Sequence, residues 1–298
     1  MDYNLDYIGN EIRNIRKEKK LTQEELAFAA DLSVDTIRRL ESGKVDIKLS
    51  SLLLILEELG LEFDIIFNSF QGSVWSYIDD YITDLDYYMD EFNYKKVEVT
   101  LGEFEKINKD ILPIFYQKKY SQYLKFYQSI IYNPKRSGQS FIKGLNKAMV
   151  ISHKDFKIEK YKNYNYTNFE YRILSAMAHY YRENGDIGLS YDILLFILNN
   201  IGKNNNLYPK ISYNISRSYS YDGDVEKALE WNKKAIDSSI RNNDTINLIN
   251  SYYQRGEILF KIENPEFLSY LNKSMDLCLL TNRPELKEKF NKLICQDK

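Results

Sequence analysis

The chain has 298 residues, of which 44% are hydrophobic, and its formal net charge is −2. This composition excludes a disordered chain and a polybasic nucleic-acid coat, so any contact with nucleic acid must depend on local placement of charge. The 12 Gly and 5 Pro are few for this length, which favours helices over a β fold with many turns.

The cysteines and the apolar segments indicate the compartment. Cys278 and Cys295 are the only two cysteines, too few for a disulfide framework, which fits a reducing environment. Residues 1–9 lack the basic and apolar segments of a signal peptide. The apolar run at residues 49–56 is too short to span a bilayer. We therefore expect a cytoplasmic protein with no membrane segment.

Residues 9–67 predict four short helices around one small core. Thr22 precedes Glu25 by three residues, which is the capping-box pattern at the start of a second helix. Ser33 begins a third helix and Gly43 ends it. The apolar residues at helical spacing predict the core: Ile12, Ile15, Leu21, Leu26, Ala27, Ile37, Leu40, Leu52, Ile55 and Leu56.

A connecting helix is expected at residues 68–92. Residues 76–92 contain six acidic residues and no Lys or Arg, while Tyr77, Leu85 and Tyr88 recur on one side at helical spacing. Two interpretations remain open for this amphipathic segment. Its acidic face is either simply solvated or contributes contacts in a dimer.

Residues 93–298 predict a helical-repeat domain. Residues 181–186 match residues 219–224, and the glycines of the two segments, Gly185 and Gly223, stand 38 residues apart. A third copy is expected to begin at residues 252–256. Repeats of this length, each a pair of antiparallel helices, are typical of a helical solenoid.

Residues 21–43 carry a pattern with several spaced requirements. Ala27 is small where two helices cross, Leu32 lies in the turn, Ile37 faces the core and Gly43 ends the helix. This stretch closely resembles the Cro/repressor, or XRE-type, helix-turn-helix family, and the match covers about one fifth of the chain. The resemblance implies a DNA-binding domain over residues 1–67, in which an ion pair between Arg16 and Glu41 ties the first and third helices.

The third helix of this domain fits the DNA major groove, where side chains near its amino end meet base edges. By resemblance, Val34, Asp35 and Arg39 are expected to read bases, although the Asp35 carboxylate also repels phosphate. The remaining positions are expected nearer the backbone. The candidate DNA-binding residues are Gln23, Ser33, Val34, Asp35, Arg38, Arg39, Lys44 and Lys48.

The charge of the domain leaves an alternative open. Residues 9–48 contain nine Lys and Arg against eight Asp and Glu. Because phosphate neutralisation dominates affinity for DNA, a monomer should bind weakly, which favours a homodimer. Alternatively, the helix-turn-helix is a protein-binding module that does not contact DNA.

The repeats resemble tetratricopeptide repeats, best at residues 208–240. Together with the XRE-type domain, they resemble the RRNPP group of peptide-pheromone receptors of Gram-positive bacteria, which includes PlcR-like and Rgg-like regulators. This resemblance implies an all-α fold: a helix-turn-helix domain followed by a right-handed superhelix of TPR-like repeats. It also implies a homodimeric quorum-sensing transcriptional regulator that binds operator DNA and a short signalling peptide.

The concave face of the repeats is the expected peptide site. Lys210, Asn214 and Arg217 share one helix face, and the repeat offsets transfer that face to the neighbouring repeats. An Asn side chain can both donate to and accept from a peptide backbone, while Arg172, Lys210 and Arg217 can hold a carboxylate. A solvated polar face is the other interpretation. The candidate peptide-binding residues are Arg172, His179, Lys210, Asn214, Arg217, Tyr221, Asn250 and Gln254.

The sequence carries no pattern that predicts an enzyme. It has no phosphate-binding glycine loop, no zinc-ligand spacing and no nucleophile elbow. His153 and His179 are too few and too isolated for a metal cluster, so we expect no metal and no cofactor. Two functions remain: a ligand-controlled DNA-binding regulator, and an adaptor in which both parts bind protein partners.

Overall fold

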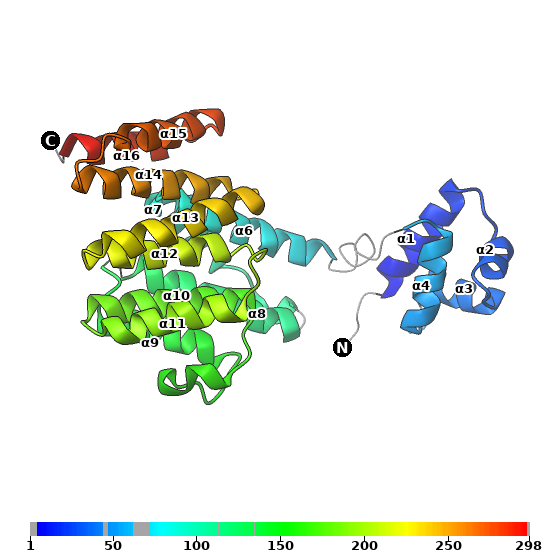
Figure 1. Cartoon of the computed structure of the whole chain (residues 1–298). Helices are drawn as coiled ribbons and strands as arrows, with labels where there is room; N and C mark the ends of the chain where they lie inside the picture. The colour runs from blue at the N-terminus through cyan, green and yellow to red at the C-terminus, as the bar shows by residue number, and fades with distance from the viewer. Residues whose placement is uncertain (1–4, 44–46, 62–71, 113, 134, 297–298) are drawn as a thin grey trace. The chain divides into compact units, whose positions relative to one another are not determined.

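The computed structural model describes residues 5–43, 47–61, 72–112, 114–133 and 135–296, and those residues form helices and no strand (Figure 1). The first elements are α1 (Leu5–Glu18), α2 (Gln23–Ala29), α3 (Val34–Glu41), α4 (Leu49–Glu58), α6 (Gly72–Asp90), α7 (Tyr94–Phe104), η1 (Lys109–Ile111), α8 (Ile114–Ile131) and α9 (Gln139–Val150). They are followed by η2 (Ile158–Asn163), α10 (Asn168–Glu183), α11 (Ile187–Asn200), α12 (Tyr208–Tyr221), α13 (Val225–Arg241), α14 (Thr245–Lys261), α15 (Phe267–Leu280) and α16 (Pro284–Gln296). None of the described helices is both long and apolar enough to cross a membrane.

The chain divides into two compact units. The helix-turn-helix unit comprises residues 1–82 and 108–117, and the repeat unit comprises residues 83–107 and 118–298. The division falls inside α6, which is one continuous helix from Gly72 to Asp90. The predicted connecting segment therefore contributes its last residues to the repeat unit.

The helix-turn-helix unit folds around the predicted core. All ten predicted core residues lie in or against one buried apolar cluster, which confirms that prediction. The Thr22 hydroxyl accepts from the Glu25 backbone N–H at 3.1 Å, and the Glu25 carboxylate accepts from the Thr22 N–H at 2.7 Å, so the predicted capping box is present. Ser33 caps α3 by accepting from Thr36 N–H at 3.1 Å. These caps fix where α2 and α3 begin.

A buried ion pair joins α1 to the end of α3. Arg16 donates from Nε to Glu41 Oε1 at 2.6 Å and from Nη2 to Oε2 at 2.9 Å. Both residues are buried, with 6% and 5% of their surface exposed. Gln23 adds a third hydrogen bond, from Nε2 to Glu41 Oε2 at 2.7 Å. This network confirms the predicted pair and holds the three helices in register.

The repeat unit contains three consecutive helix pairs, α10–α11, α12–α13 and α14–α15, which stack side by side (Figure 1). Gly185 and Gly223 lie between the helices of the first two pairs with φ of +90° and +80°, a conformation that favours glycine. The next residue in each turn, Asp186 or Asp224, caps the following helix. The repeated sequence therefore forms the turn between the two helices of each of these pairs.

The turn of the third repeat lies later in the chain than predicted. Helix α14 runs from Thr245 to Lys261, so residues 252–256 lie inside it. The Asn264 N–H donates to the Leu259 carbonyl after this helix, as the Asp186 and Asp224 N–H groups donate five residues back in the first two turns. Gly256 is therefore not a turn residue. A Cβ at this position would lie 2.5 Å from Leu271 Cδ2 and 3.2 Å from the Phe267 carbonyl oxygen, so glycine permits α15 to pack closely on α14.

Gly256→Ala is expected to destabilise the repeat unit by about 1–3 kcal/mol, because the added methyl group meets a buried side chain and a backbone oxygen. Urea unfolding followed by circular dichroism measures the change. Gly188→Ala is the matched control, since Gly188 also lies in a helix and its Cβ would meet nothing within 4 Å. That variant should be neutral or slightly stabilising. Equal destabilisation of both variants would contradict the packing argument.

The acidic face of α6 is not simply solvated. Asp86 accepts from Arg172, with 2.8 Å between Nη1 and Oδ2, and also from the Tyr127 hydroxyl at 2.5 Å. Asp90 pairs with Lys210 at 3.4 Å, and Glu91, just after the helix, pairs with Arg283. Carboxylates at and just after the end of α6 thus bind cations of the repeat unit, which corrects the solvated interpretation for these residues.

Candidate functional site

The first candidate site is the outer face of α3. Ser33, Val34, Asp35, Arg38 and Arg39 are all exposed, while the opposite face of the helix is buried in the core. Val34 is 38% exposed, and its apolar side chain suits contact with a thymine methyl group. The predicted base-reading side chains are therefore gathered on one accessible helix face.

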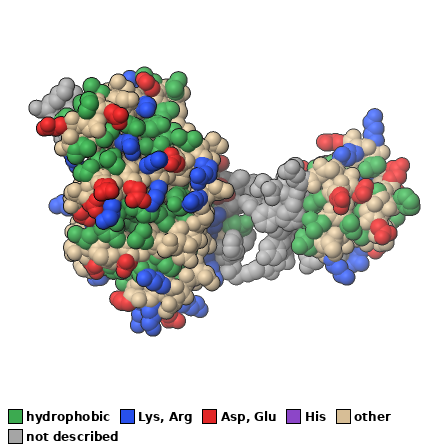
Figure 2. Space-filling model, in the orientation of Figure 1, with side chains coloured by type: hydrophobic (Ala, Val, Ile, Leu, Met, Phe, Trp, Pro, Cys, Tyr) green, Lys and Arg blue, Asp and Glu red, His purple; other side chains and the backbone are tan. Residues whose placement is uncertain are grey.

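Asp35 moderates the charge of this face. Its carboxylate pairs with Arg38 one turn along, and Arg39 Nη1 lies 3.9 Å from Asp35 Oδ2. The three side chains are more than half exposed, so these pairs add little stability and can exchange partners easily. Basic and acidic side chains are likewise interspersed over the faces of both units seen in Figure 2.

Of the three residues predicted to contact phosphate, the structure describes two. Gln23 is half-buried at the start of α2, and its bond to Glu41 orients its amide. Lys48 is exposed at the cap of α4. Lys44 lies outside the described residues.

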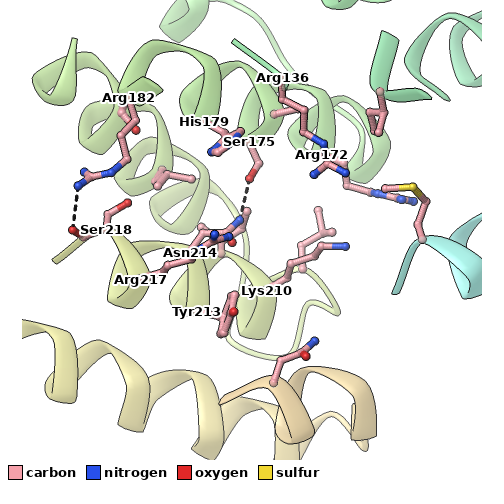
Figure 3. Close-up of a pocket in the computed structure, with 18 of the residues that line it drawn as sticks. Arg136, Arg172, Ser175, His179, Arg182, Lys210, Tyr213, Asn214, Arg217 and Ser218 are labelled. Atoms are coloured by element: carbon pink, nitrogen blue, oxygen red, sulfur yellow. Dashed lines mark hydrogen bonds between the residues drawn. The ribbon is translucent and has the colours of Figure 1, made fainter. Parts of the chain in front are cut away.

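The second candidate site is a cavity of about 240 Å³ within the repeat unit. Its side chains come mainly from α10 and α12, with others from the end of α6, from α7 to α9 and the loop before α9, from α11 and from the start of α14 (Figure 3). Seven of the eight predicted peptide-binding residues line it: Arg172, His179, Lys210, Asn214, Arg217, Tyr221 and Asn250. The structure therefore brings together residues that the sequence spreads over 79 positions.

Asn214 lies in the middle of the cavity wall. Its Nδ2 donates to Ser175 Oγ at 3.2 Å across the gap between α12 and α10 (Figure 3). Apolar side chains form the rest of the wall, among them Phe126, Phe141 and Leu194. A polar amide framed by apolar residues is the arrangement that orients a small ligand while burying its apolar surface.

The charge of the cavity is predominantly positive. Among the described lining residues there are five Lys and Arg and two acidic residues, Asp90 and Glu183. Three cations are paired with carboxylates: Arg172 with Asp86, Lys210 with Asp90 and Arg182 with Asp222. The other two are Arg136 and Arg217, and both donate to tyrosine hydroxyls instead.

Gln254 does not line the cavity. It is 4% exposed, and its Oε1 accepts from Asn232 Nδ2 at 3.1 Å in the contact between α13 and α14. The amide of Asn232, which is fully buried, needs partners, and Gln254 supplies one. The structure thus gives Gln254 a packing role, and we remove it from the predicted site.

Most of the lining residues were not predicted, and three of these bear on the chemistry of the cavity. Arg136 lies in the loop between α8 and α9, outside the repeated segments, so no repeat offset leads to it. Arg182 belongs to the repeated turn sequence and was interpreted only as part of that turn. Tyr213 precedes the predicted Asn214 on α12, and burial raises the pKa of its hydroxyl to about 12.

His179 is held in its neutral form by its surroundings. Burial lowers its pKa below the ordinary 6.5, Glu183 opposes this shift, and the positive charges of Arg217, Arg136 and Arg182 reinforce it. The unfolded chain therefore binds a proton more readily than the folded one. The repeat unit should lose stability as the pH falls from about 6.5 through the lowered pKa.

A proton NMR titration tests this shift, because the chain has two histidines and His179→Gln assigns their resonances. We expect the His179 resonance of the full chain to titrate below pH 6.5. Titration at or above 6.5 would contradict the electrostatic picture of the cavity.

In a comparison with known proteins, two ranges of the chain match two different protein families. Residues 12–66 match the family described as helix-turn-helix, and residues 116–270 match the RNPP family C-terminal domain. A segment of 59 residues, 20% of this chain, is 39% identical to y4mF, an uncharacterised HTH-type transcriptional regulator of Sinorhizobium fredii, and covers 78% of that protein.

Solved structures that resemble the whole chain include those of PlcR and ComR. The structure of PlcR from Bacillus thuringiensis in complex with the peptide PapR7 and DNA has a TM-score of 0.74 and 21% identity, covering 96% of this chain and 99% of PlcR. The structure of ComR from S. thermophilus in complex with DNA and its signalling peptide ComS has a TM-score of 0.64 and 16% identity, covering 97% of this chain and 99% of ComR. At these identities the likeness establishes the helical-repeat fold.

Proposed function

Since this chain belongs to the RNPP family, we propose that it is a transcriptional regulator whose affinity for DNA is controlled by a short peptide bound in the repeat cavity. One observation carries the proposal. The chain combines an exposed face of α3, in a helix-turn-helix unit, with a positively charged cavity in the repeat unit. Asn214 lies in the wall of this cavity, and seven of the residues that line it were predicted from the sequence. We place its action in the cytoplasm, where DNA is accessible.

The α3 face supports the DNA-binding half of the proposal. Val34 is exposed at the first residue, and Arg39 in the last turn, of a helix that fits the major groove. The unit is close to electrically neutral, so two copies in a homodimer would supply the phosphate contacts that one copy lacks.

The cavity supports the peptide-binding half. Asn214 can satisfy both the donor and the acceptor of a peptide backbone, and the apolar wall can bury a side chain. The end of α6 supplies a connection between the two halves, because Asp86 and Asp90 pair with Arg172 and Lys210 at the cavity. A ligand that competes for Arg172 and Lys210 would weaken the contacts that hold the end of α6, which is one continuous helix from Gly72 to Asp90.

A gel-shift assay with the DNA upstream of this protein's own gene tests the proposal. We expect the full chain to shift that fragment and not a scrambled fragment of equal composition. If no fragment from the upstream region is shifted, with or without added peptides, the DNA-binding function is wrong. An adaptor that binds proteins through both units would then be the better interpretation.

Arg39→Ala is expected to lower affinity for the shifted fragment about 5- to 150-fold, because an arginine that binds a base edge contributes roughly 1–3 kcal/mol. Lys48→Ala is the matched comparison, since Lys48 is exposed but lies beyond α3. It should weaken binding to all DNA similarly and reduce the salt dependence by about one unit of slope. Fluorescence anisotropy at several salt concentrations measures both. Identical effects of the two variants on specific and random DNA would contradict a base-reading role for Arg39.

A further inference from the structure

A strongly basic segment lies outside both candidate sites. Residues 143–162 run from within α9 to within η2 and contain six lysines and two acidic residues, in a chain whose formal net charge is −2. All six lysines are exposed, and none of them is among the described residues that line the cavity. Together they form a lysine face: Lys143, Lys147, Lys154, Lys157, Lys160 and Lys162.

Buried aromatic residues fix the part of the lysine face that follows α9. Phe156 is 7% exposed and Tyr161 is 4% exposed, and each has a lysine as its neighbour in the chain. The Tyr161 ring packs edge-on against Phe196 of α11, with 5.1 Å between the ring centroids. The rings of His153 and Tyr164 are 5.2 Å apart, so the two ends of this segment lie close together. Because the aromatic side chains fill the interior, the lysines between them remain at the surface.

The charges of the lysine face are not balanced by ion pairs. Lysines of α7, α12 and α13 lie within 4.0 Å of carboxylates, whereas none of the six lysines does so in the part of the chain that the structure describes. The two acidic residues of the segment, Asp155 and Glu159, are themselves exposed. An ammonium group is a compact charge on a flexible stem, which suits contact with phosphate. A polyanion therefore complements this surface.

DNA is the polyanion that the rest of the molecule favours. Residues 9–48, which include α3, contain nine Lys and Arg against eight Asp and Glu. The helix-turn-helix therefore offers the shape that enters a major groove but little of the charge that dominates affinity for DNA. The lysine face has the complementary properties, since it supplies positive charge without a helix of the recognition type.

We propose that the lysine face binds the phosphate backbone of the DNA that flanks the site recognised by α3. This inference rests on the proposed DNA-binding function and adds a second contact surface, in the repeat unit. Contacts between lysine and phosphate strengthen binding and fix the position of the protein, but they do not read the base sequence. The flanking DNA therefore contributes through its length and not through its sequence.

Two DNA fragments test the proposal. The short fragment is the smallest piece of the upstream DNA that the full chain still binds in preference to a scrambled sequence, and the long fragment is the same piece extended on both sides by unrelated sequence. Fluorescence anisotropy at several salt concentrations gives the affinity and its salt dependence. We expect the long fragment to be bound at least about fivefold more tightly at low salt, with a slope steeper by at least about one unit, because phosphate contacts release counterions.

Double variants identify the residues responsible. Lys154→Gln combined with Lys157→Gln should reduce the slope on the long fragment by at least about one unit and leave binding to the short fragment unchanged. The corresponding double arginine variant keeps both charges and should bind like the wild-type protein. Lys233→Gln combined with Lys261→Gln is the control, because these two lysines are also exposed but lie on α13 and α14 (Figure 1). Circular dichroism confirms that each variant is folded.

The outcomes separate this inference from the proposed function. Equal affinities and slopes of the wild-type protein on the two fragments would overturn the flanking contact while leaving DNA binding by α3 intact. A glutamine variant that behaves like the control would overturn the assignment to the lysine face. If that variant instead loses dimers in analytical ultracentrifugation, the face belongs to a contact between two copies of this chain, and the proposal is wrong. Failure of the full chain to prefer any upstream fragment would refute the DNA-binding function itself, and this inference would fail with it.

Discussion

Glu41→Ala is expected to unfold the helix-turn-helix unit and to abolish DNA binding, while the repeat unit stays folded. The substitution leaves the Arg16 guanidinium buried without its anion and removes the acceptor of Gln23. Breaking one side of a buried ion pair typically costs about 3–5 kcal/mol. That is a large fraction of the roughly 5–15 kcal/mol that stabilises a whole small protein.

Hydrogen exchange measured by mass spectrometry locates the effect. Helices α1 to α4 should lose protection in the variant, and α10 to α15 should retain it. Glu57→Ala is the control, because Glu57 is an exposed glutamate on α4 and should leave protection unchanged. Normal protection of α1 and α3 in the Glu41 variant would show that the pair is dispensable.

The same pair predicts a pH dependence of the wild-type unit. Burial opposes ionisation of Glu41, but hydrogen bonds from Arg16 and Gln23 prevail and lower its pKa below the ordinary 4.5. The stability that this carboxylate contributes is therefore present above about pH 4.5 and is lost as the pH falls through the lowered pKa.

Asp86→Ala is expected to have the largest effect within the repeat unit, at about 2–3 kcal/mol. The variant removes the carboxylate that accepts from Arg172 and from the fully buried Tyr127. Hydrogen bonds to charged groups contribute more than neutral ones, and a buried donor left without a partner bears the cost of its desolvation. We also expect the end of α6 to exchange faster than in the wild-type protein.

Urea unfolding and hydrogen exchange of the full chain measure these effects. Asp84→Ala is a close control, since Asp84 lies two residues away on the same helix and is exposed. Equal unfolding free energies for the two variants would mean that the Asp86 network does not hold α6. In that case the proposed route from the cavity to the helix-turn-helix unit would lose its structural basis.

Local features of the fold were predictable because they depend on neighbouring residues. Capping of α2 by Thr22 and Glu25 involves atoms three positions apart, and the turns at Gly185 and Gly223 repeat one short pattern. The position of the third repeat was not predictable in this way. Gly256 resembles a turn glycine in the sequence, but its role is to admit Leu271, which only the packed structure reveals.

Most of the cavity was predictable because a solenoid repeats the same helix face. Transferring the face of Lys210 and Asn214 by the repeat offset leads to Arg172 on one side and Asn250 on the other. The same transfer predicts Gln254 at the cavity, but this side chain accepts a hydrogen bond from the buried Asn232 amide between α13 and α14 instead. Which amide is buried depends on how α13 crosses α14, and the sequence pattern does not contain that information.

The charge partners of the cavity could not be predicted from the sequence. Asp86 and Arg172 are 86 residues apart, and Asp86 lies outside the repeated segments, so no repeat offset leads from one residue to the other. The acidic segment therefore looked solvated. Arg136 is similar, because its place at the cavity follows from the path of a loop that lies outside the repeats.

The most direct test of the account is the affinity of the full chain for its upstream DNA fragment. Fluorescence anisotropy measures this affinity with and without a saturating concentration of a peptide selected for binding to the full chain. We predict that the peptide changes the dissociation constant at least about fivefold, the lower end of typical coupling between sites. Asn214→Ala should remove this change. A dissociation constant that is the same with and without bound peptide would contradict control of DNA binding by the cavity.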